Sequence, residues 1–459
     1  MSLGLTDADL PLLVGRFAQQ LPATGRLWVA LSGGLDSTVL LHALCAARHR
    51  ELIAGELAAV HVNHGLSSAA PAMAEAASRL ARSLEVPLCR LRVHPARCNE
   101  TAAREARYGA LQALLQPGDV VLTAHHRDDQ AETFLLQALR GHGVAGCAAM
   151  PAMARLGQGW LGRPLLTVPR AALSDYARCH GLSWIDDPGN APLDVPRNAL
   201  RHMVMPALAA IEPDAQGALC RAASQAARAA ALLEALARAD LAGALPGPGM
   251  LDWRALGHLD DLRRGNALHH WLKDHGLHLA LPALDELMRQ IEQARGDRHP
   301  LLHSQGHVVR WHRGLLYLLP DRHQHGESKQ GCEVLTWPQP HEPLALPADR
   351  SQLLLRADGP GGGLDASFLH CSWTVRLRRG GERLRLPGRS HRHAVKDLLQ
   401  QRAMPPWQRQ RLPLVYVDDE LAAVPGVAVG AAFWSRESRW MVHWEPGTAA
   451  GQNGEKRHA

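Results

Sequence analysis

The first 200 residues alternate short apolar runs with longer amphipathic stretches, and this alternation restricts the possible folds more than any other feature of the chain. The apolar runs have the length of strands and occupy residues 27–31, 57–62, 88–93 and 119–124. The stretches that follow them have helical spacing and occupy residues 38–48, 73–84, 102–115 and 128–140. Strands that alternate with helices run parallel and are joined by right-handed crossovers. We therefore expect a doubly wound parallel α/β sheet that binds its ligands beyond the carboxyl ends of the strands.

The pattern changes after about residue 206. Three helices are predicted at 215–242, 260–275 and 282–294, and a hairpin is predicted at 308–319. Prolines crowd residues 338–347 and indicate a linker. We predict five segments, namely an α/β domain over 1–210, a helical domain over 211–336, a linker over 337–352, a small mixed α+β domain over 353–446 and a flexible tail over 447–459.

The cysteines and the apolar runs exclude several classes of protein. The eight cysteines include no Cys-x-x-Cys pair, so zinc ribbons, iron–sulfur ligation and thioredoxin-like chemistry have no signature here. The first 20 residues have no basic leader with a cleavage site, and no apolar run is long enough to span a membrane. We therefore expect a soluble, cytoplasmic protein with no membrane partner.

A glycine-rich loop joins the first predicted strand to its helix. It reads Ser32-Gly33-Gly34-Leu35-Asp36-Ser37. Two glycines let the backbone turn tightly and approach a ligand, and the N–H groups of a helix N-terminus favour an anion. The spacing differs from a Walker loop, and no lysine follows. The loop resembles the pyrophosphate-binding loop of the PP-loop ATP pyrophosphatase family, which cuts ATP between its α and β phosphates.

The loop by itself leaves several substrates open, because enzymes that make GMP, NAD or argininosuccinate and enzymes that modify tRNA share it. Four further motifs narrow the choice. They are His61-Val62-Asn63-His64-Gly65-Leu66, the stretch 99–108, the stretch 123–133, and Trp184-Ile185-Asp186-Asp187-Pro188 before Arg197-Asn198. In this order they resemble the tRNA(Ile)-lysidine synthetase family, closely over residues 27–210 and more loosely to about residue 430.

This resemblance implies a two-step reaction. ATP adenylates the C2 carbonyl oxygen of the wobble cytidine in the CAU anticodon of an isoleucine tRNA, and pyrophosphate leaves. Free L-lysine then attacks C2 and expels AMP, which gives lysidine and changes decoding from AUG to AUA and identity from methionine to isoleucine. The resemblance implies ATP and Mg²⁺ as cofactors and allows a homodimer. It makes residues 1–210 the catalytic domain, and it makes residues 211–336 and 353–446 tRNA-binding domains.

The resemblance also assigns the site residues. ATP-binding roles fall on Ser32, Gly33, Gly34, Leu35, Asp36, Ser37, His61 and Asn63. Catalytic roles fall on Asp36, His125, Asp129, Glu132, Arg104, Arg107 and Arg197. Asp129 and Glu132 are three residues apart and share a helix face, as suits carboxylates that hold Mg²⁺ beside phosphates. Asp36 or Glu132 is our candidate for the base that deprotonates lysine, and we expect His126 at the surface.

The net charge of +6 is concentrated near one end of the chain. Residues 376–411 contain ten arginines and Lys396 against two acids, a net +9, so the other 423 residues sum to −3. Such a stripe suits a phosphate backbone. We predict tRNA contacts from Arg376, Arg378, Arg379, Arg383, Arg385, Arg389, Arg392 and Lys396. The runs 376–378 and 383–385 read as paired strands around Gly380-Gly381. Trp373 and Trp407 are expected to pack in the core rather than to stack on bases.

Two alternatives remain. Another PP-loop enzyme, such as a tRNA thiolase, usually relies on catalytic or cluster-binding cysteines, and the chain has no Cys-x-x-Cys pair. A non-catalytic RNA-binding protein with a degenerate ATP site would not need the intact loop or the acids at 128–132. Lysine- and tRNA-dependent pyrophosphate release separates the three possibilities.

Overall fold

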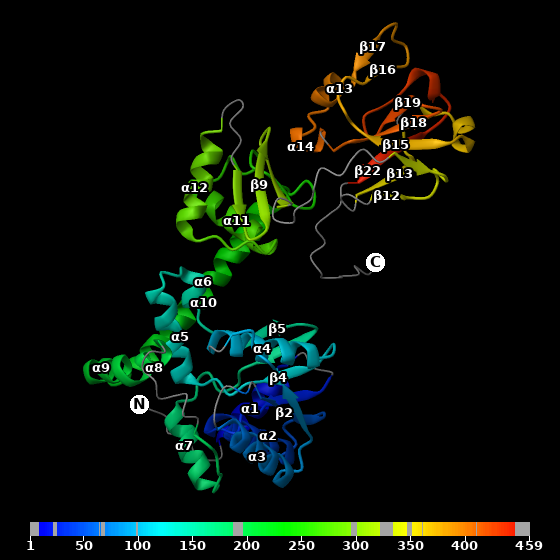
Figure 1. Ribbon diagram of the computed structural model, residues 1–459. Helices are drawn as coiled ribbons and strands as arrows, with labels where there is room; N and C mark the ends of the chain where they lie inside the picture. Colours follow the sequence, from blue (N-terminus) through cyan, green and yellow to red (C-terminus); the bar gives the residue numbers. More distant parts are fainter. Residues whose placement is uncertain are drawn as a thin grey trace. The chain divides into compact units, whose positions relative to one another are not determined.

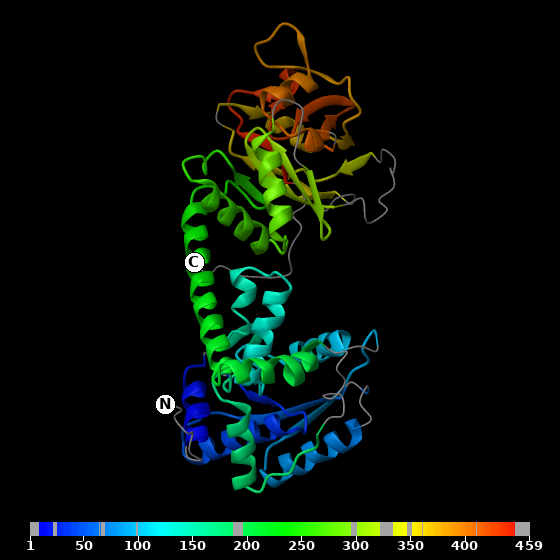
Figure 2. The same cartoon turned by 90° about the vertical axis from the view of Figure 1, so that its left-hand side faces the viewer.

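The structure is a computed structural model, and it describes residues 9–21, 25–63, 65, 69–97, 100–186, 196–294, 301–321, 334–346, 351–359, 361–409 and 411–445. The predicted motif residues His64, Leu66, Asn99, Asp187 and Pro188 and the predicted tail lie outside the described residues. The chain divides into two compact units, Met1–Leu233 (unit 1) and Glu234–Ala459 (unit 2), which are drawn from two directions in Figure 1 and Figure 2.

Unit 1 is built on a six-stranded sheet with the order β3-β2-β1-β4-β6-β5. Its strands are β1 (Leu27–Ala30), β2 (Leu57–Asn63), β3 (Leu88–Arg92), β4 (Val120–Leu122), β5 (Met153–Leu156) and β6 (Gly159–Gly162). All neighbours are parallel except β5, which pairs antiparallel with β6. This confirms the predicted doubly wound sheet, and it adds the β5–β6 hairpin, which was not predicted.

Nine helices among the described residues accompany this sheet up to residue 211. They are α1 (Asp9–Gln19), α2 (Leu35–His49), α3 (Ala70–Ser83), α4 (Glu100–Leu114), α5 (Arg127–Leu139), α6 (Val144–Cys147), α7 (Arg170–Cys179), α8 (Pro196–Ala199) and α9 (Met205–Ile211). A π-helical turn, Leu200–Val204, links the last two. Side chains of α1, α2, α3 and α7 share one core cluster with the sheet, whereas those of α4 share the other. The two clusters bury both faces of the sheet, as a parallel sheet requires.

Helix α10 (Ala215–Leu241) spans the division between the units, and the next part of the chain is a helical layer with a small sheet. Helices α11 (Asp261–Asp274) and α12 (Leu281–Glu292) share a core with a sheet of order β7-β10-β9-β8. Its strands are β7 (Met250–Asp252), β8 (Leu301–Ser304), β9 (His307–His312) and β10 (Leu315–Pro320). The three predicted helices and the β9–β10 hairpin are confirmed.

The C-terminal part of unit 2 contains two five-stranded sheets and one two-stranded sheet, with the orders β11-β15-β18-β19-β20, β12-β13-β22-β14-β21 and β16-β17. The strands are β11 (Leu335–Trp337), β12 (Leu344–Leu346), β13 (Ser351–Ala357), β14 (Gly363–Leu364), β15 (Trp373–Leu377), β16 (Arg383–Arg385), β17 (Arg392–Ala394), β18 (Pro413–Val417), β19 (Glu420–Val424), β20 (Ala428–Val429), β21 (Trp434–Ser435) and β22 (Trp440–Glu445). Among the described residues, two short α-helices accompany them, α13 (Val395–Gln401) and α14 (Pro406–Arg409).

Two predictions about this part differ from the structure. The runs 376–378 and 383–385 do not pair with each other, because β15 lies between β11 and β18 whereas β16 pairs with β17. The predicted linker contains strand β12, which pairs with β13; Pro338, Pro340 and Pro343 lie outside this strand, where they interrupt no ladder hydrogen bond. No helix among the described residues is long and apolar enough to cross a membrane.

Candidate active site

The loop from Ser32 to Ser37 is held in a tight turn by its own side chains. The Ser32 backbone N–H donates to Ser37 Oγ at 3.1 Å, and the two serine hydroxyls lie 2.9 Å apart. Ser37 Oγ also donates to the Gly34 carbonyl oxygen at 3.1 Å. Gly33 has φ +91°, and a Cβ on it would lie 2.4 Å from the Met73 carbonyl oxygen. The first glycine is therefore required by the backbone itself.

A second segment of the chain lies against this turn. The Ile185 backbone N–H donates to the Gly33 carbonyl oxygen at 3.1 Å, so the motif that begins at Trp184 borders the loop. A Cβ on Gly34, by contrast, would meet nothing closer than Ser32 Oγ at 3.5 Å. The protein itself leaves room for a side chain at Gly34, and we infer that the space belongs to a ligand.

A cavity of about 340 Å³ opens at the carboxyl ends of β1, β2 and β4, next to the loop. This is the edge of a parallel sheet at which ligands bind. The residues predicted from the sequence that line it are Ser32, Gly34, Leu35, Asp36, Ser37, His61, Asn63, Arg107 and His125, together with Asp186 of the motif at 184–188. Gly33 faces Met73 instead, and Arg104, Asp129, Glu132 and Arg197 do not line the cavity.

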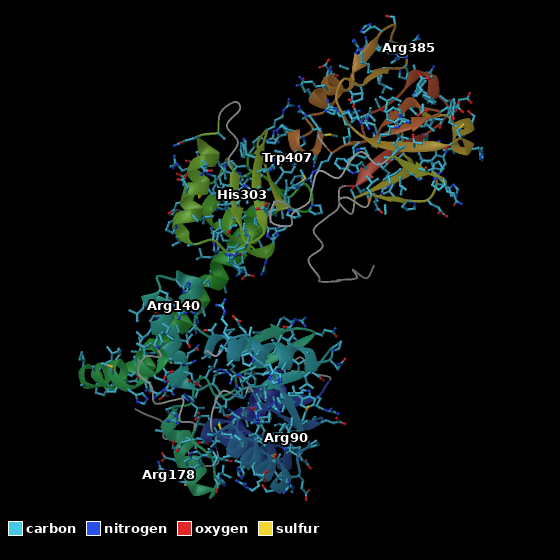
Figure 3. The ribbon with its side chains drawn as sticks, in the orientation of Figure 1. Arg90, Arg140, Arg178, His303, Arg385 and Trp407 are labelled. Carbon is cyan, nitrogen blue, oxygen red and sulfur yellow. The ribbon has the colours of Figure 1, made fainter. Side chains whose placement is uncertain are left out.

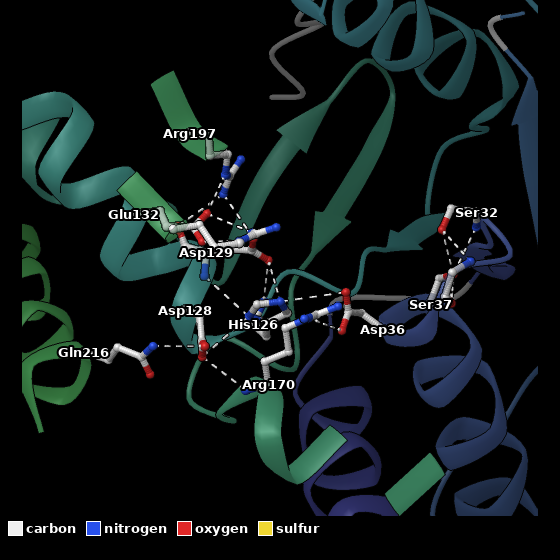
Figure 4. A network of polar contacts seen from close by, with 12 residues as sticks. Ser32, Asp36, Ser37, His126, Asp128, Asp129, Glu132, Arg170, Arg197 and Gln216 are labelled. Atoms are coloured by element: carbon white, nitrogen blue, oxygen red, sulfur yellow. Dashed lines mark hydrogen bonds and ion pairs between the residues drawn. The ribbon is translucent and has the colours of Figure 1, made fainter. Parts of the chain in front are cut away.

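His126 connects the loop to the acids of helix α5 (Figure 4). It was expected at the surface, but it is buried and forms the N-cap of α5. The Asp129 N–H donates to His126 Nδ1 at 3.4 Å, which leaves Nε2 facing the two carboxylates. That nitrogen lies 3.4 Å from Asp129 Oδ2 and 3.8 Å from Asp36 Oδ2. The expectation failed because a capping histidine followed three residues later by an acid was not recognised as a cap.

Glu132 is buried and its carboxylate is shared by two arginines. Arg197 Nε donates to Oε2 at 2.7 Å, and Arg201 Nε donates to Oε1 at 2.7 Å. Arg201 Nη2 reaches Oε2 as well, at 3.0 Å. The same two arginines lie 3.2 and 3.4 Å from Asp129 Oδ1. The predicted grouping of Asp129, Glu132 and Arg197 is therefore present, but both Glu132 oxygens are already occupied.

Arg201 and Arg170 belong to the site although the sequence reasoning missed them. Arg201 is four residues after Arg197 on a helical segment, and this spacing places both on one face. Arg170, at the start of α7, has Nε 3.6 Å from Asp36 Oδ1, and its backbone N–H donates to Asp128 Oδ1 at 3.1 Å. The Arg197–Arg201 spacing was a detectable signal, whereas the position of Arg170 depends on tertiary packing.

The two acids nearest His126 differ in their electrostatic environments. Burial raises the pKa of Asp36, and the charges of His126 and Arg170 only partly oppose it. Burial acts in the same direction on Asp129, but His126 and Arg197 outweigh it and hold the pKa of Asp129 below its ordinary value. Asp36 Oδ1 accepts no hydrogen bond among the described residues. Asp36 Oδ1 is thus buried without a hydrogen bond from the described residues, 3.6 Å from Arg170 Nε, whereas Asp129 accepts hydrogen bonds from His126 and Arg197.

His125 is a neutral imidazole at the wall of the cavity. Its Nδ1 lies 2.8 Å from Thr123 Oγ1. Burial lowers the pKa of His125 to about 3. The negative charge of Asp129 raises this pKa, whereas the positive charges of Arg163, Arg197 and Arg104 lower it. Arg163 is buried as well and makes no ion pair among the described residues; its Nη1 donates to the Pro151 carbonyl oxygen at 2.7 Å. Arg104 stacks on the ring of Tyr108, with its Cζ 4.9 Å from the ring centroid.

The predicted tRNA-binding residues fall into two groups. Arg376 and Arg378 pair within the domain, with Asp419 and Glu382 respectively. The other six are exposed, and they are Arg379, Arg383, Arg385, Arg389, Arg392 and Lys396. Four of these lie on or between β16 and β17, and Arg385 marks the place in Figure 3. We call Arg383, Arg385, Arg389 and Arg392 the β16–β17 arginines.

The two tryptophans serve packing, as expected. Trp373 is fully buried, and its Nε1 donates to the Phe368 carbonyl oxygen at 2.8 Å. Trp407 lies against strands β9 and β10, with its ring centroid 5.3 Å from that of Tyr317 and 5.3 Å from Arg310 Cζ (Figure 3). Trp373 thus packs in the core, whereas Trp407 is half-buried.

The loop, the cavity at the strand ends and the parallel sheet define unit 1 as a PP-loop nucleotide-binding domain. The family model for the PP-loop domain matches residues 13–208. The models for the TilS substrate binding domain and the TilS substrate C-terminal domain match residues 251–317 and 373–444.

Relatives match nearly the whole chain. A tRNA(Ile)-lysidine synthase from Pseudomonas fluorescens is 38% identical over 97% of this chain and 98% of its own length. One from Xanthomonas axonopodis pv. citri is 40% identical over 96% and 99%. The chain therefore belongs to the tRNA(Ile)-lysidine synthase family and is an ATP-dependent ligase. Among solved structures, a U34-tRNA thiolase from Methanococcus maripaludis matches 48% of this chain and 77% of its own with 16% identity and a TM-score of 0.41, which is only a loose likeness.

Proposed function

We propose that the protein joins free L-lysine to C2 of the wobble cytidine in the CAU anticodon of isoleucine tRNA, through a cytidine adenylated by ATP. Pyrophosphate leaves in the first step and AMP in the second. The product, lysidine, pairs with A and changes the tRNA from AUG to AUA decoding and from methionine to isoleucine identity. The observation that carries the proposal is the junction at His126, which brings the phosphate loop and the acid–arginine cluster of α5 within 4 Å of one side chain.

The adenylation step explains why a phosphate-binding loop and positively charged side chains are needed at one site. A pyrimidine carbonyl oxygen is a very poor leaving group, so it must be converted to an AMP ester before an amine can displace it. The loop and the N-terminus of α2 suit the phosphates of ATP. Arg107 lines the same cavity, and Arg104 lies one helical turn before it; their charge suits the negative charge that develops on the phosphates.

Asp36 fits a magnesium ion better than the pair predicted from the sequence. Mg²⁺ is usually held by one or two carboxylates together with substrate phosphates. Glu132 has both oxygens bound to arginines, and no group of three metal-ligating side chains occurs among the described residues. Asp36 lines the cavity and its side chain is 31% exposed, although its Oδ1 is buried beside Arg170. We propose Asp36 as the ligand; Mg²⁺ bound there supplies charge neutralisation at the phosphates.

The lysine step needs an unprotonated amine. Of the two carboxylates considered as its base, Glu132 has both oxygens bound by Arg197 and Arg201. Asp36 has a raised pKa because of burial, and this makes it the stronger proton acceptor. We propose that Asp36 takes the lysine proton after pyrophosphate has left.

The test is pyrophosphate release by the purified protein with ATP, Mg²⁺, lysine and an isoleucine tRNA that has a CAU anticodon. We expect release that requires the tRNA, and AMP formation that also requires lysine. A tRNA that carries another wobble base is the matched control. No pyrophosphate from the complete mixture would refute the proposal, and AMP formation without lysine would refute its second step.

A further inference from the structure

The positive charge of unit 1 is concentrated on one short segment. Residues 1–233 contain 21 arginines and 19 acids, a net +2. The segment 86–97 contains Arg90, Arg92 and Arg97 with no acid, a net +3, so the rest of the unit sums to −1. The segment comprises strand β3 and the turn that follows it.

Strand β3 presents this charge to solvent at the edge of the sheet. It is the first strand in the order β3-β2-β1-β4-β6-β5, so only β2 pairs with it. Cys89 and Leu91 pack against the core cluster shared with α4, whereas Arg90 and Arg92 alternate with them and are exposed. His94 and Arg97 are exposed beyond the strand. We call Arg90, Arg92, His94 and Arg97 the β3 rim, and Figure 3 labels Arg90.

The β3 rim makes no ion pair among the described residues. Some other exposed arginines of unit 1 have acidic partners, such as Arg26 with Glu56 at 2.6 Å and Arg178 with Asp175 at 3.4 Å, whereas Arg82 and Arg140 have none among the described residues. Charged side chains on an edge strand also prevent sheet-to-sheet association, and either sign of charge serves that purpose. Edge protection alone therefore explains charge on β3 but not the exclusive use of arginine.

The register places the rim beside the nucleotide cavity. Arg92 pairs with Asn63, which lines the cavity, and the Val93 N–H donates to the Asn63 carbonyl oxygen at 2.9 Å. Arg92 and Asn63 therefore lie side by side at the carboxyl edge of the sheet. Arg90 is two residues farther from this edge, about 7 Å along the strand. The positive charge thus begins where the cavity opens.

We propose that the β3 rim binds the phosphodiester backbone of the RNA substrate next to the nucleotide that enters the cavity. The inference rests on the proposed function, because it assumes an RNA substrate at this cavity. Arginine suits the partner, since its planar fork binds phosphate oxygens in pairs. Phosphate contacts fix the position of an RNA and carry no sequence information. The rim thus positions the anticodon loop, and the choice of cytidine is made inside the cavity.

The experiment compares single charge reversals in the full-length protein. Arg92→Glu and Arg90→Glu change the rim and keep a charge on the edge strand. Arg178→Glu on α7 makes the same change in charge at an exposed arginine away from the cavity lining (Figure 3). The probe is an RNA hairpin with a CAU loop, and its dissociation constant is measured at several salt concentrations.

We expect Arg92→Glu to weaken hairpin binding and to reduce the slope of log K against log salt by about 0.7, the value for one phosphate contact on a single strand. Arg90→Glu should have a smaller effect, and Arg178→Glu should match the unchanged protein. A hairpin with a different loop should be weakened equally. Equal binding by the Arg92→Glu and Arg178→Glu variants would overturn the proposal, and so would a loss restricted to the CAU loop.

Measurements of ATP binding and pyrophosphate release distinguish a failure of the rim proposal from a failure of the proposed function. If the unchanged protein releases no pyrophosphate with any tRNA, the proposed function fails first. If it is active and the rim variants bind the hairpin normally, only the rim proposal fails. Should Arg92→Glu weaken ATP binding through its neighbour Asn63, Arg97→Glu replaces it, because Arg97 lies outside the sheet and the cavity lining. Normal hairpin binding by Arg97→Glu would then overturn the proposal.

Discussion

At the scale of single residues, the site depends on which carboxylate retains free capacity. Glu132 accepts hydrogen bonds from two arginines and Asp129 caps a helix with His126, so both carboxylates are bound within the protein. Asp36 alone of the three combines a place in the cavity lining with an oxygen that accepts no hydrogen bond among the described residues. The phosphate chemistry therefore depends most on Asp36.

Asp36→Asn should reduce pyrophosphate release by at least about 100-fold, as expected when one preorganised electrostatic group is removed. It should leave the melting temperature unchanged or slightly raised, because burial already disfavours the charged form of Asp36. Turnover and gel-shift assays with tRNA check this. A parallel loss of turnover and tRNA binding would show that Asp36 supports the fold rather than the reaction.

His125 should make stability depend on pH in a defined direction. Its pKa is lowered to about 3 by burial, whereas in the unfolded chain it is about 6.5. Between these values the unfolded state binds the proton and the folded state does not, so stability is full above pH 6.5 and is lost as the pH falls toward 3. One proton contributes at most about 1.4 kcal/mol per pH unit.

His125→Gln should remove this contribution. The free energy of unfolding, measured with urea at pH values from 7 to 4.5, should decline less steeply in the variant than in the unchanged protein. His49→Gln, which replaces an exposed histidine at the end of α2, is the control and should retain the full decline. Identical slopes for all three proteins would show that His125 titrates normally in the folded state.

At the scale of elements, the two glycines of the loop have different tasks. Gly33→Ala forces a Cβ to within 2.4 Å of the Met73 carbonyl oxygen at φ +91°, so we expect a loss of roughly 1–3 kcal/mol in unfolding free energy. Gly34→Ala meets no atom closer than 3.5 Å, so stability should be retained while ATP binding weakens. Urea unfolding and equilibrium dialysis with ATP check the pair. Equal destabilisation by both variants would contradict this division.

The elements of unit 1 were predictable because their signals are local. Runs such as 27–31 and 57–62 became β1 and β2, and the rule that ligands bind at the carboxyl ends of strands located the cavity. The β5–β6 hairpin was not predicted, because its strands are only four residues long and β5 lies antiparallel at the edge of the sheet. The contact of Arg170 with Asp36 was not predicted either, because the packing of α7, and not a sequence spacing, brings the two residues together.

The C-terminal strands show the limit of local patterns more clearly. The alternation at 376–378 and 383–385 correctly indicated strands, but β15 and β16 belong to different sheets. Alternation tells which residues point outward and does not identify the partner strand. Arg376 and Arg378 consequently pair with acids inside the domain, while the β16–β17 arginines remain exposed.

At the scale of the whole molecule, positive charge is concentrated in two places. Residues 376–411 carry a net +9 and residues 86–97 a net +3, while the chain as a whole carries +6. Both segments expose arginines, and the acids elsewhere offset them. An RNA substrate would thus meet one basic surface in each unit, and its affinity should depend steeply on salt.

Replacing Arg383, Arg385 and Arg389 together by glutamine should weaken tRNA binding and reduce the salt slope by about 2, since each phosphate that is no longer neutralised accounts for about 0.7. ATP binding should be unaffected, because these residues belong to unit 2. Arg356→Gln on β13, whose arginine already pairs with Glu445, is the control and should leave the slope unchanged. An unchanged slope in the triple variant would mean that the β16–β17 arginines are only a solvated surface.

Under the proposed function, unit 1 activates a wobble cytidine for attack by lysine. The most direct measurement follows labelled lysine into tRNA, with ATP consumed to AMP in the same mixture. We predict one lysine per CAU-anticodon isoleucine tRNA and one AMP per lysine, with none in the same tRNA when its wobble cytidine is replaced by uridine. Transfer of lysine to the uridine tRNA, or ATP cleavage to AMP with no lysine in the CAU tRNA, would contradict the claim.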